Sequence, residues 1–186
     1  MEDMSASHGM TLFDTAVGSC GVVWGDDGIV GIALPSDQGE PSATRADLVA
    51  AYPEAVEGPA PEAVRVAIDG MVALLAGEPV DLGEVRVDLN GVPDFYRRVY
   101  EVTRAIPPGS TLTYGEVAAR LGMPGAVRAV GQALGRNPVP VVVPCHRVVA
   151  AGGALGGFSA PGGAVTKRRM LQIEGALPAP PPTLFD

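Results

Sequence analysis

Residues 138–153 read PVPVVVPCHRVVAAGG, in which an apolar run ends directly at a cysteine and a histidine. The continuous apolar stretch Val139–Val143 predicts a buried strand, because a strand covered on both faces shows no polar alternation. If that strand continued straight, Cys145 and His146 would point to opposite faces. Pro144 interrupts it, so we expect the two side chains to turn toward a common cavity.

A cysteine beside a histidine has two interpretations. In the first it is a nucleophile, because the thiolate is the reactive form and a basic neighbour raises its population. In the second it is a structural cysteine whose neighbouring histidine points elsewhere, which is the commoner situation for an isolated Cys-His pair. Cys20 is the only other cysteine, which is too few for a disulfide framework or a four-cysteine zinc site.

Two short helices are predicted immediately upstream. The segment TYGEVAARLG begins with Thr113 and has Glu116 three positions later, the capping-box pattern of a helix start. Residues 123–125, MPG, break the chain before a second helix, AVRAVGQALGRN. Such a pair forms a helix-turn-helix pattern, which alone is a weak sign of nucleic-acid binding. The expected inward face of the first helix consists of Val117, Ala118 and Leu121. One face of the second helix is expected to carry Ala126, Ala129, Val130, Ala133 and Leu134.

The second helix is rich in small residues, and Arg128 and Arg136 are its only charges. Small side chains would let its backbone approach a narrow DNA groove. They would equally allow close packing against other helices, so composition leaves both interpretations open. The small residues are Ala126, Ala129, Gly131, Ala133 and Gly135.

Charge is divided unevenly along the chain. The net charge is −8, yet residues 1–90 hold 16 acidic and 3 basic residues, whereas residues 91–175 hold 10 basic and 4 acidic ones. Like charge gathered in one half predicts a surface that faces a polyanion. The alternative is chance segregation with an acidic, solubilising first half.

The first half predicts a small α/β unit. Residues 19–35, SCGVVWGDDGIVGIALP, suggest two strands around an Asp-Gly turn. Helices are predicted over 43–55 and 61–77, and EVRVDL, residues 84–89, alternates as a strand does. No catalytic constellation is visible in this half.

We therefore expect an α+β fold. A small N-terminal α/β domain with a short antiparallel sheet would span 1–90, a mainly helical domain would span 91–175, and a flexible proline-rich tail would span 176–186. No apolar run reaches the roughly 18 residues that a membrane span needs, and the acidic N-terminus is unlike a secretory signal. We expect a cytoplasmic protein that does not bind membranes.

The segment VPCHRVV, preceded by YGEVAARLGMPGAVRAVGQALGRNP and followed by GGFS and KRRMLQIEGA, resembles one family. It is similar to the methylated-DNA–protein-cysteine S-methyltransferases, the O6-alkylguanine repair proteins. The resemblance covers about Phe95 to Gly175, and the Pro-Cys-His-Arg element is its most specific part. The N-terminal half fits the family's variable α/β domain in layout only.

The resemblance implies an irreversible, stoichiometric transfer of the alkyl group from O6-alkylguanine to the protein. It assigns the acceptor thiol to Cys145, a base acting through a water to His146, and the carboxylate that orients this base to Glu174. Asn137 would tie the turn before the cysteine. This is the nucleophile, base and orienter logic of a hydrolase triad, but a thioether is a stable end point, so each molecule would act once.

The resemblance also implies how DNA is bound. The lesion is inaccessible in a stacked duplex, so its nucleotide must be flipped out at a cost of about a few kcal/mol. Arg128 would fill the gap, Tyr114 would crowd the rotated phosphate, and Ala129, Gly131 and Arg136 would contact DNA from the same helix. The implied partner is double-stranded DNA containing O6-alkylguanine, bound by a monomer without cofactor or metal. Activity on O4-alkylthymine is left open.

A pocket for the flipped base is implied around the acceptor cysteine. The carbonyls of Cys145 and Val148 would read the guanine edge, and Ser159 would donate a hydrogen bond to O6. Tyr114 could instead belong to the core, and Lys167 could contact only phosphate or solvent. The implied pocket residues are Tyr114, Val148, Gly156, Gly157, Phe158, Ser159 and Lys167.

Three positions depart from the family's pattern. The loop FSAPGGAVTK is about two residues longer than usual, Phe158 replaces a tyrosine, and Tyr100 stands where tryptophan is frequent. Two other functions remain possible alternatives. One is a protein that flips alkylguanine without repairing it, but relatives of that kind lack the acceptor cysteine. The other is a cysteine hydrolase of small amides or esters, for which the sequence supplies no substrate pocket.

Overall fold

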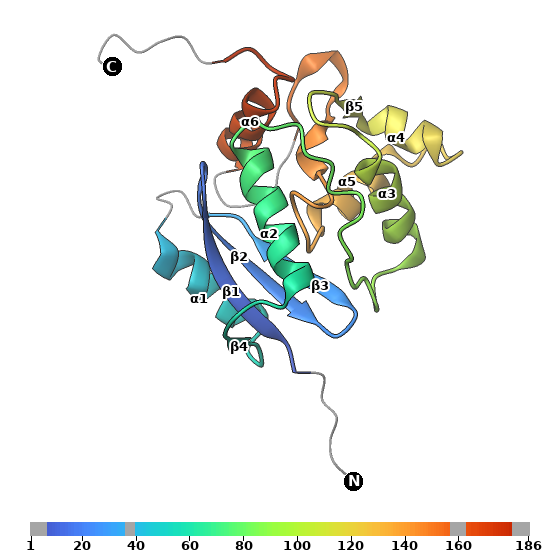
Figure 1. Ribbon diagram of the computed structural model, residues 1–186. Helices are drawn as coiled ribbons and strands as arrows, with labels where there is room; N and C mark the ends of the chain where they lie inside the picture. The colour runs from blue at the N-terminus through green and yellow to red at the C-terminus, as the bar shows by residue number, and fades with distance from the viewer. Residues whose placement is uncertain (1–6, 36–39, 157–162, 180–186) are drawn as a thin grey trace.

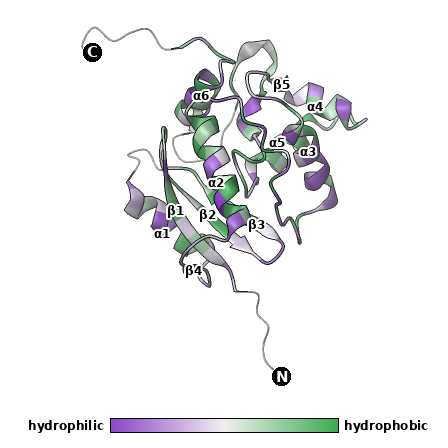
Figure 2. Ribbon diagram, viewed as in Figure 1, coloured by the Kyte–Doolittle hydropathy of each residue, from purple (hydrophilic) through white to green (hydrophobic). Residues whose placement is uncertain are grey.

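The computed structural model describes residues 7–35, 40–156 and 163–179. A sheet with two helices forms the N-terminal half and the rest is mainly helical, so the predicted α+β fold is confirmed (Figure 1). Hydrophobic residues dominate α2 (Glu62–Leu75), whereas hydrophilic ones dominate α3 (Asp94–Arg104), as Figure 2 shows. Within the described ranges no helix is long and apolar enough to cross a membrane.

The predicted hairpin, formed by β2 (Gly18–Gly25) and β3 (Gly28–Ala33), is part of a four-stranded sheet with β1 (Gly9–Thr15) and β4 (Val56–Glu57). The strand order is β3-β2-β1-β4. Its central strand β2 pairs antiparallel with β1 and β3, and β4 joins β1 in parallel. Gly28 has a φ of 134°, and a Cβ there would lie 2.8 Å from the carbonyl oxygen of Arg86, so this turn requires glycine.

Helices cover both faces of this sheet. Val22 of β2 belongs to the main core together with the apolar side of α2. The next residue, Val23, belongs to a smaller cluster with Met10 and with Leu48 of α1 (Pro41–Ala51). Because neighbouring side chains of a strand point to opposite faces, the uninterrupted apolar run of β2 fits a strand buried on both sides.

Residues 84–89 do not form the predicted strand. Their only ladder contact is a single bridge between Val87 and Ile29. Just before and at the start of this segment, Nη2 of Arg104 donates to three backbone carbonyls. These carbonyls belong to Leu82, Gly83 and Val85, at 3.1, 3.0 and 2.8 Å. The chain therefore bends around a guanidinium before Arg86. Only residues 86–88 lie beside β3, where the Ile29 N–H donates to the Arg86 carbonyl at 3.0 Å and the Asp88 N–H donates to the Ile29 carbonyl at 2.8 Å.

The predicted helix pair is confirmed as α4 (Tyr114–Arg120) and α5 (Val127–Gly135), which pack against α3 and against each other. The Thr113 hydroxyl accepts from the Glu116 N–H at 3.0 Å, so the capping pattern is also confirmed. Short strands β5 (Leu112–Thr113) and β6 (Val148–Val149) pair in parallel. The short turn η2 (Ala151–Gly153), in which Gly152 has a φ of 78°, and α6 (Gly163–Ile173) follow.

The two halves share one hydrophobic core, to which β2, α2, α3, α4 and α5 all contribute. At the sheet edge, the N–H of Ile32 donates to the carbonyl of Pro138 at 2.9 Å. Arg169 of α6 donates to the carbonyl of Ala16 in the β1–β2 turn. The sheet therefore braces the segment that leads to Cys145. The division into domains near residue 90 stays a prediction, and residues 180–186 of the tail lie outside the described chain.

Candidate active site

The segment before Cys145 is a buried turn, and the strand predicted there is wrong. Val143 donates its N–H back to the carbonyl of Val139 at 2.9 Å, and Val141 between them has a φ of 74°. Asn137 fixes both ends, because its Nδ2 donates to the Val143 carbonyl at 2.8 Å and its Oδ1 accepts from the Val139 N–H at 3.0 Å. A β-branched residue with positive φ is strained, so the predicted Asn137 tie holds an otherwise unfavourable conformation.

Cys145, His146 and Arg147 form the single 3₁₀-helical turn η1 (Cys145–Arg147). The N–H of Arg147 donates to the carbonyl of Pro144 at 2.9 Å, which closes the turn. Successive side chains of such a turn lie about 120° apart rather than on opposite faces. All three are buried, with exposed fractions of 8%, 0% and 5%. The chain therefore changes direction at Pro144, as expected. It leaves a buried turn rather than a strand, and it enters a helical turn.

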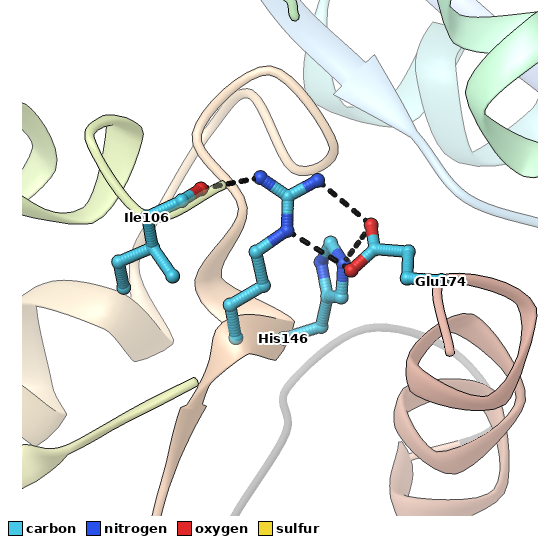
Figure 3. A network of polar contacts seen from close by, with 4 residues as sticks. Ile106, His146 and Glu174 are labelled. Carbon is cyan, nitrogen blue, oxygen red and sulfur yellow. Dashed lines mark hydrogen bonds and ion pairs between the residues drawn. The ribbon is translucent and has the colours of Figure 1, made fainter. Parts of the chain in front are cut away.

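Glu174, the residue after α6, links the histidine to the arginine (Figure 3). Its Oε1 lies 2.8 Å from Nε2 of His146 and 2.8 Å from Nη2 of Arg147. Its Oε2 accepts from Nε of Arg147 at 3.0 Å. The remaining Nη1 of Arg147 donates to the carbonyl of Ile106, close after α3, at 2.7 Å. The Glu174 side chain is 3% exposed, so this is a buried polar network.

These contacts set the protonation of the network. Burial raises the pKa of Glu174, but hydrogen bonds from His146 and Arg147 outweigh it and lower that pKa to about 2. A carboxylate only accepts hydrogen bonds, so Nε2 of His146 carries the hydrogen. Burial lowers the pKa of His146, which favours the neutral ring with a lone pair on Nδ1. This Nδ1 is buried and has no hydrogen-bond partner among the described residues.

The thiol of Cys145 is affected by opposing influences. Burial raises its pKa, whereas a hydrogen bond with Asn137 and the charge of Lys167 lower it. Lys167 is fully buried, which excludes the interpretation that it contacts solvent, and its Nζ donates to the Val148 carbonyl at 2.7 Å. Burial lowers the pKa of Lys167 to about 8, against the effect of Cys145. An ammonium group near the sulfur favours the thiolate.

The predicted pocket residues lie around this sulfur only in part. The two carbonyls expected to read guanine each accept one hydrogen bond already, that of Cys145 from the Val148 N–H and that of Val148 from Lys167. Each carbonyl keeps a second lone pair. Gly157, Phe158 and Ser159 lie outside the described residues, so their roles stay predictions. The same holds for residues 158–162 of the longer loop, whereas residues 163–167 form the start of α6.

Tyr114 and Gly156 approach each other closely. Tyr114 is half-buried beside the main core, and its ring centre lies 5.7 Å from Nζ of Lys167. Gly156 has a φ of 74°, and a Cβ there would lie 2.9 Å from Cε2 of Tyr114. Glycine is therefore required by both conformation and space. Both the core and the pocket interpretations of Tyr114 fit this position.

Helix α5 has a buried and an exposed side. Val130, Ala133 and Leu134 are buried, whereas Arg128 and Arg136 are exposed. Ala133 is buried, as expected for close packing against other helices. Ala129 and Gly131 are partly exposed, as expected for a backbone that approaches a DNA groove. Of the residues expected on one face of this helix, Val130, Ala133 and Leu134 are buried, Ala129 is partly buried, and Ala126 is the partly buried N-cap.

Sequence reasoning assigned no role to two buried polar side chains. Tyr100, at the position where tryptophan is frequent, is 1% exposed and donates its hydroxyl to the carbonyl of Ala133 at 2.7 Å, which fixes α3 to α5. Arg147 completes the Glu174 network. Its signal was present, since an arginine inside an apolar segment needs an acidic partner.

A buried thiol followed by a carboxylate-bound imidazole, in a helix-turn-helix half with exposed arginines, fits the class of DNA-binding proteins whose reactive group is a cysteine. Residues 94–176 match the family described as 6-O-methylguanine DNA methyltransferase, DNA binding domain. The chain belongs to the methylated-DNA–protein-cysteine methyltransferase family. This confirms the family resemblance and the enzyme class expected from the sequence.

Relatives and solved structures support this membership along most of the chain. The methyltransferase of Methanothermobacter thermautotrophicus is 40% identical over 155 residues, which are 83% of this chain and 78% of that protein. That of Mycobacterium tuberculosis is 44% identical over 128 residues, 69% of this chain and 75% of that protein. The crystal structure of M. tuberculosis O6-methylguanine methyltransferase aligns with a TM-score of 0.72 and 35% identity, over 96% of this chain and 99% of that one.

A structure of the M. tuberculosis protein in complex with DNA aligns with a TM-score of 0.69 and 36% identity. The alignment covers 89% of this chain and 92% of that chain. The structural similarity therefore includes the N-terminal half. From the sequence, that half resembled the family only in the arrangement of its predicted elements.

Proposed function

We propose that this protein repairs DNA by transferring the alkyl group of O6-alkylguanine to its own Cys145. The observation that carries the proposal is the buried His146–Glu174 pair, which supplies a neutral base next in the chain to the thiol. The relatives named methylated-DNA–protein-cysteine methyltransferase support it. A lesion-binding protein without transfer is not favoured, because acceptor and base are both present.

The chemical step is a displacement at the alkyl carbon. Nδ1 of His146 takes the Cys145 proton through a water, and the sulfur forms a bond to the alkyl carbon. The bond from that carbon to O6 breaks, and its electron pair stays on the guanine, which then takes up a proton. Glu174 stabilises the imidazolium by accepting its Nε2–H. No step releases the alkyl group from the thioether, so each molecule acts once.

Access to the lesion requires base flipping. Arg128 projects from the exposed side of α5 and is the residue that we assign to the gap left in the duplex. Tyr114, at the start of α4, is assigned to the rotated nucleotide. The solved complex of the M. tuberculosis relative with DNA supports duplex DNA as the partner. The cytoplasm is the proposed site of action.

The test is mass spectrometry after incubation with duplex DNA that contains O6-methylguanine. We expect the peptide with Cys145 to gain one methyl group and the DNA to regain unmodified guanine. A Cys145→Ala variant should keep lesion binding and lose transfer. Absence of any mass gain with excess lesion DNA would overturn the proposal in favour of lesion binding alone.

A further inference from the structure

We propose that Arg147 is a positioning residue that holds His146 and Glu174 in the arrangement able to take the thiol proton. It acts through Glu174 rather than on the reacting sulfur. The proposal rests on the function proposed above, in that His146 serves as the base. The family resemblance implies no role for this arginine.

Arg147 joins two segments that are far apart in the sequence (Figure 3). One edge of its guanidinium contacts both oxygens of Glu174, at 3.0 and 2.8 Å. The opposite nitrogen, Nη1, donates to the carbonyl of Ile106 at 2.7 Å. Ile106 lies just beyond α3 and Glu174 just beyond α6, so the guanidinium fixes one chain segment against the other. A planar fork of donors can serve both at once, whereas the ammonium of lysine cannot.

This two-point contact fixes the orientation of the carboxylate. Oε1 of Glu174 is shared between Nε2 of His146 and Nη2 of Arg147, which prevents the carboxylate from rotating away from the ring. Without the arginine the carboxylate is free to turn, and the imidazole is free to carry its hydrogen on Nδ1 instead. A hydrogen on Nδ1 would prevent that atom from accepting the thiol proton. Arg147 therefore selects the productive tautomer.

Charge acts in addition to geometry. Burial lowers the pKa of His146, Glu174 raises it, and the charges of Arg147 and Lys167 lower it further. Cys145 precedes His146 in the chain and is a further titratable group at the site, and Tyr100 and Tyr114 interact with it. Removing the Arg147 charge should raise the pKa of His146, so that the ring becomes protonated, and unable to act as a base, at a higher pH than before.

The experiment compares Arg147→Met and Arg147→Lys with Arg104→Met as a matched control. Arg104 is another partly buried arginine, and it donates to three backbone carbonyls away from the thiol. The chain has only two histidines, His8 and His146, so nitrogen-15 NMR of labelled histidine resolves each ring. The tautomer and titration of His146 are measured without DNA. Single-turnover transfer rates and lesion-DNA affinity are measured across pH.

We expect the unsubstituted protein and Arg104→Met to show only the Nε2–H tautomer of neutral His146. Arg147→Met should show a mixture of tautomers, and its transfer rate should fall on the order of tenfold to a hundredfold with unchanged affinity for lesion DNA. The acid limb of its rate profile should move to higher pH. Arg147→Lys should lie between, because it keeps the charge but not the fork.

The proposal is overturned if the Arg147 variants keep the single tautomer and the original transfer rate while only their melting temperatures fall, as for Arg104→Met. If Arg147→Met does not fold, the same readouts on Arg147→Lys decide. Failure of the unsubstituted protein to accept a methyl group would overturn the proposed function instead. The tautomer measurement needs no DNA and would still test the role of Arg147.

Discussion

The two cysteines lie in different halves of the molecule, and both are buried. Cys20 in β2 is 1% exposed, and Cys145 in η1 is 8% exposed. Burial raises the pKa of Cys20 to about 11, and the hydroxyl of Thr15, 3.7 Å from its sulfur, opposes this only in part. Such a thiol is inert, because almost none of it is thiolate at neutral pH.

Burial raises the pKa of Cys145 as well, but the surroundings differ. Asn137 and the ammonium of Lys167 oppose the effect of burial, and His146 supplies a base next in the chain. The comparison shows that depth in the fold does not distinguish an acceptor from a structural thiol. The two thiols differ in the turn that Asn137 fixes before Cys145, and in Lys167 of α6 and Glu174 just after α6.

The largest effect is expected from Glu174→Gln, which removes the charge that orients His146 and leaves the Arg147 charge buried and unpaired. Transfer to Cys145 should fall on the order of a hundredfold, and the free energy of unfolding should fall by about 3 kcal/mol. In the unfolded protein both cysteines should react with iodoacetamide at similar rates. The labelling rate of each cysteine in the folded variant, compared with that in the folded unsubstituted protein, then shows whether only Cys145 is affected. Equal change at Cys20 would mean general loosening of the fold.

Glu174 also predicts a pH dependence of stability. Its pKa of about 2 in the folded protein lies below the ordinary value of a glutamate, so its contribution is present above about pH 4.3 and is lost as pH falls toward 2. This loss amounts to about 3 kcal/mol. The free energy of unfolding, measured with urea at a series of pH values, should decline more steeply toward low pH than that of Glu174→Gln. Parallel curves for the two proteins would contradict the lowered pKa of Glu174.

Arg128→Ala separates access to the lesion from chemistry at the sulfur. Repair of O6-methylguanine in duplex DNA should fall about tenfold, because the flipped state loses the side chain that fills the gap. Transfer from the free base and labelling of either cysteine should not change. Arg65→Ala, an exposed arginine in α2, is the matched control. Equal loss on duplex and free base would remove the assigned role of Arg128.

Lys167→Met should have a smaller effect, which is measured at the thiol of Cys145. Loss of the neighbouring ammonium raises the pKa of Cys145, so its iodoacetamide labelling at pH 7 should slow several-fold while that of Cys20 is unchanged. The difference from the unsubstituted protein should shrink as pH rises through about 8, where Lys167 itself loses its proton. A difference that persists undiminished above that pH would contradict an electrostatic role.

Local patterns predicted those parts of the fold that local forces form. The Thr113–Glu116 cap and the hairpin turn at Gly28 depend on neighbouring residues, and both are confirmed. The strand predicted over 139–143 is absent, and the side chain of Asn137 binds the backbone at both ends of that segment. The strand predicted over 84–89 is reduced to a single bridge, after a turn whose carbonyls bind Arg104. Hydrophobic periodicity cannot show bonds of that kind.

The candidate site divides in the same way. The adjacent Cys145 and His146 were visible in the sequence, whereas Glu174, 28 residues beyond His146, came only from the family resemblance. The structure places it at hydrogen-bond distance. Arg147 was missed, because its partners at Glu174 and Ile106 lie 27 and 41 residues away.

The most direct test of the account is the number of methyl groups accepted per protein molecule when lesion DNA is in excess. We predict a plateau at one methyl group, with all of it on Cys145 and none on Cys20. Continued conversion of lesions beyond that ratio, or a methyl group carried by any other residue, would contradict the claim that Cys145 is an irreversible acceptor.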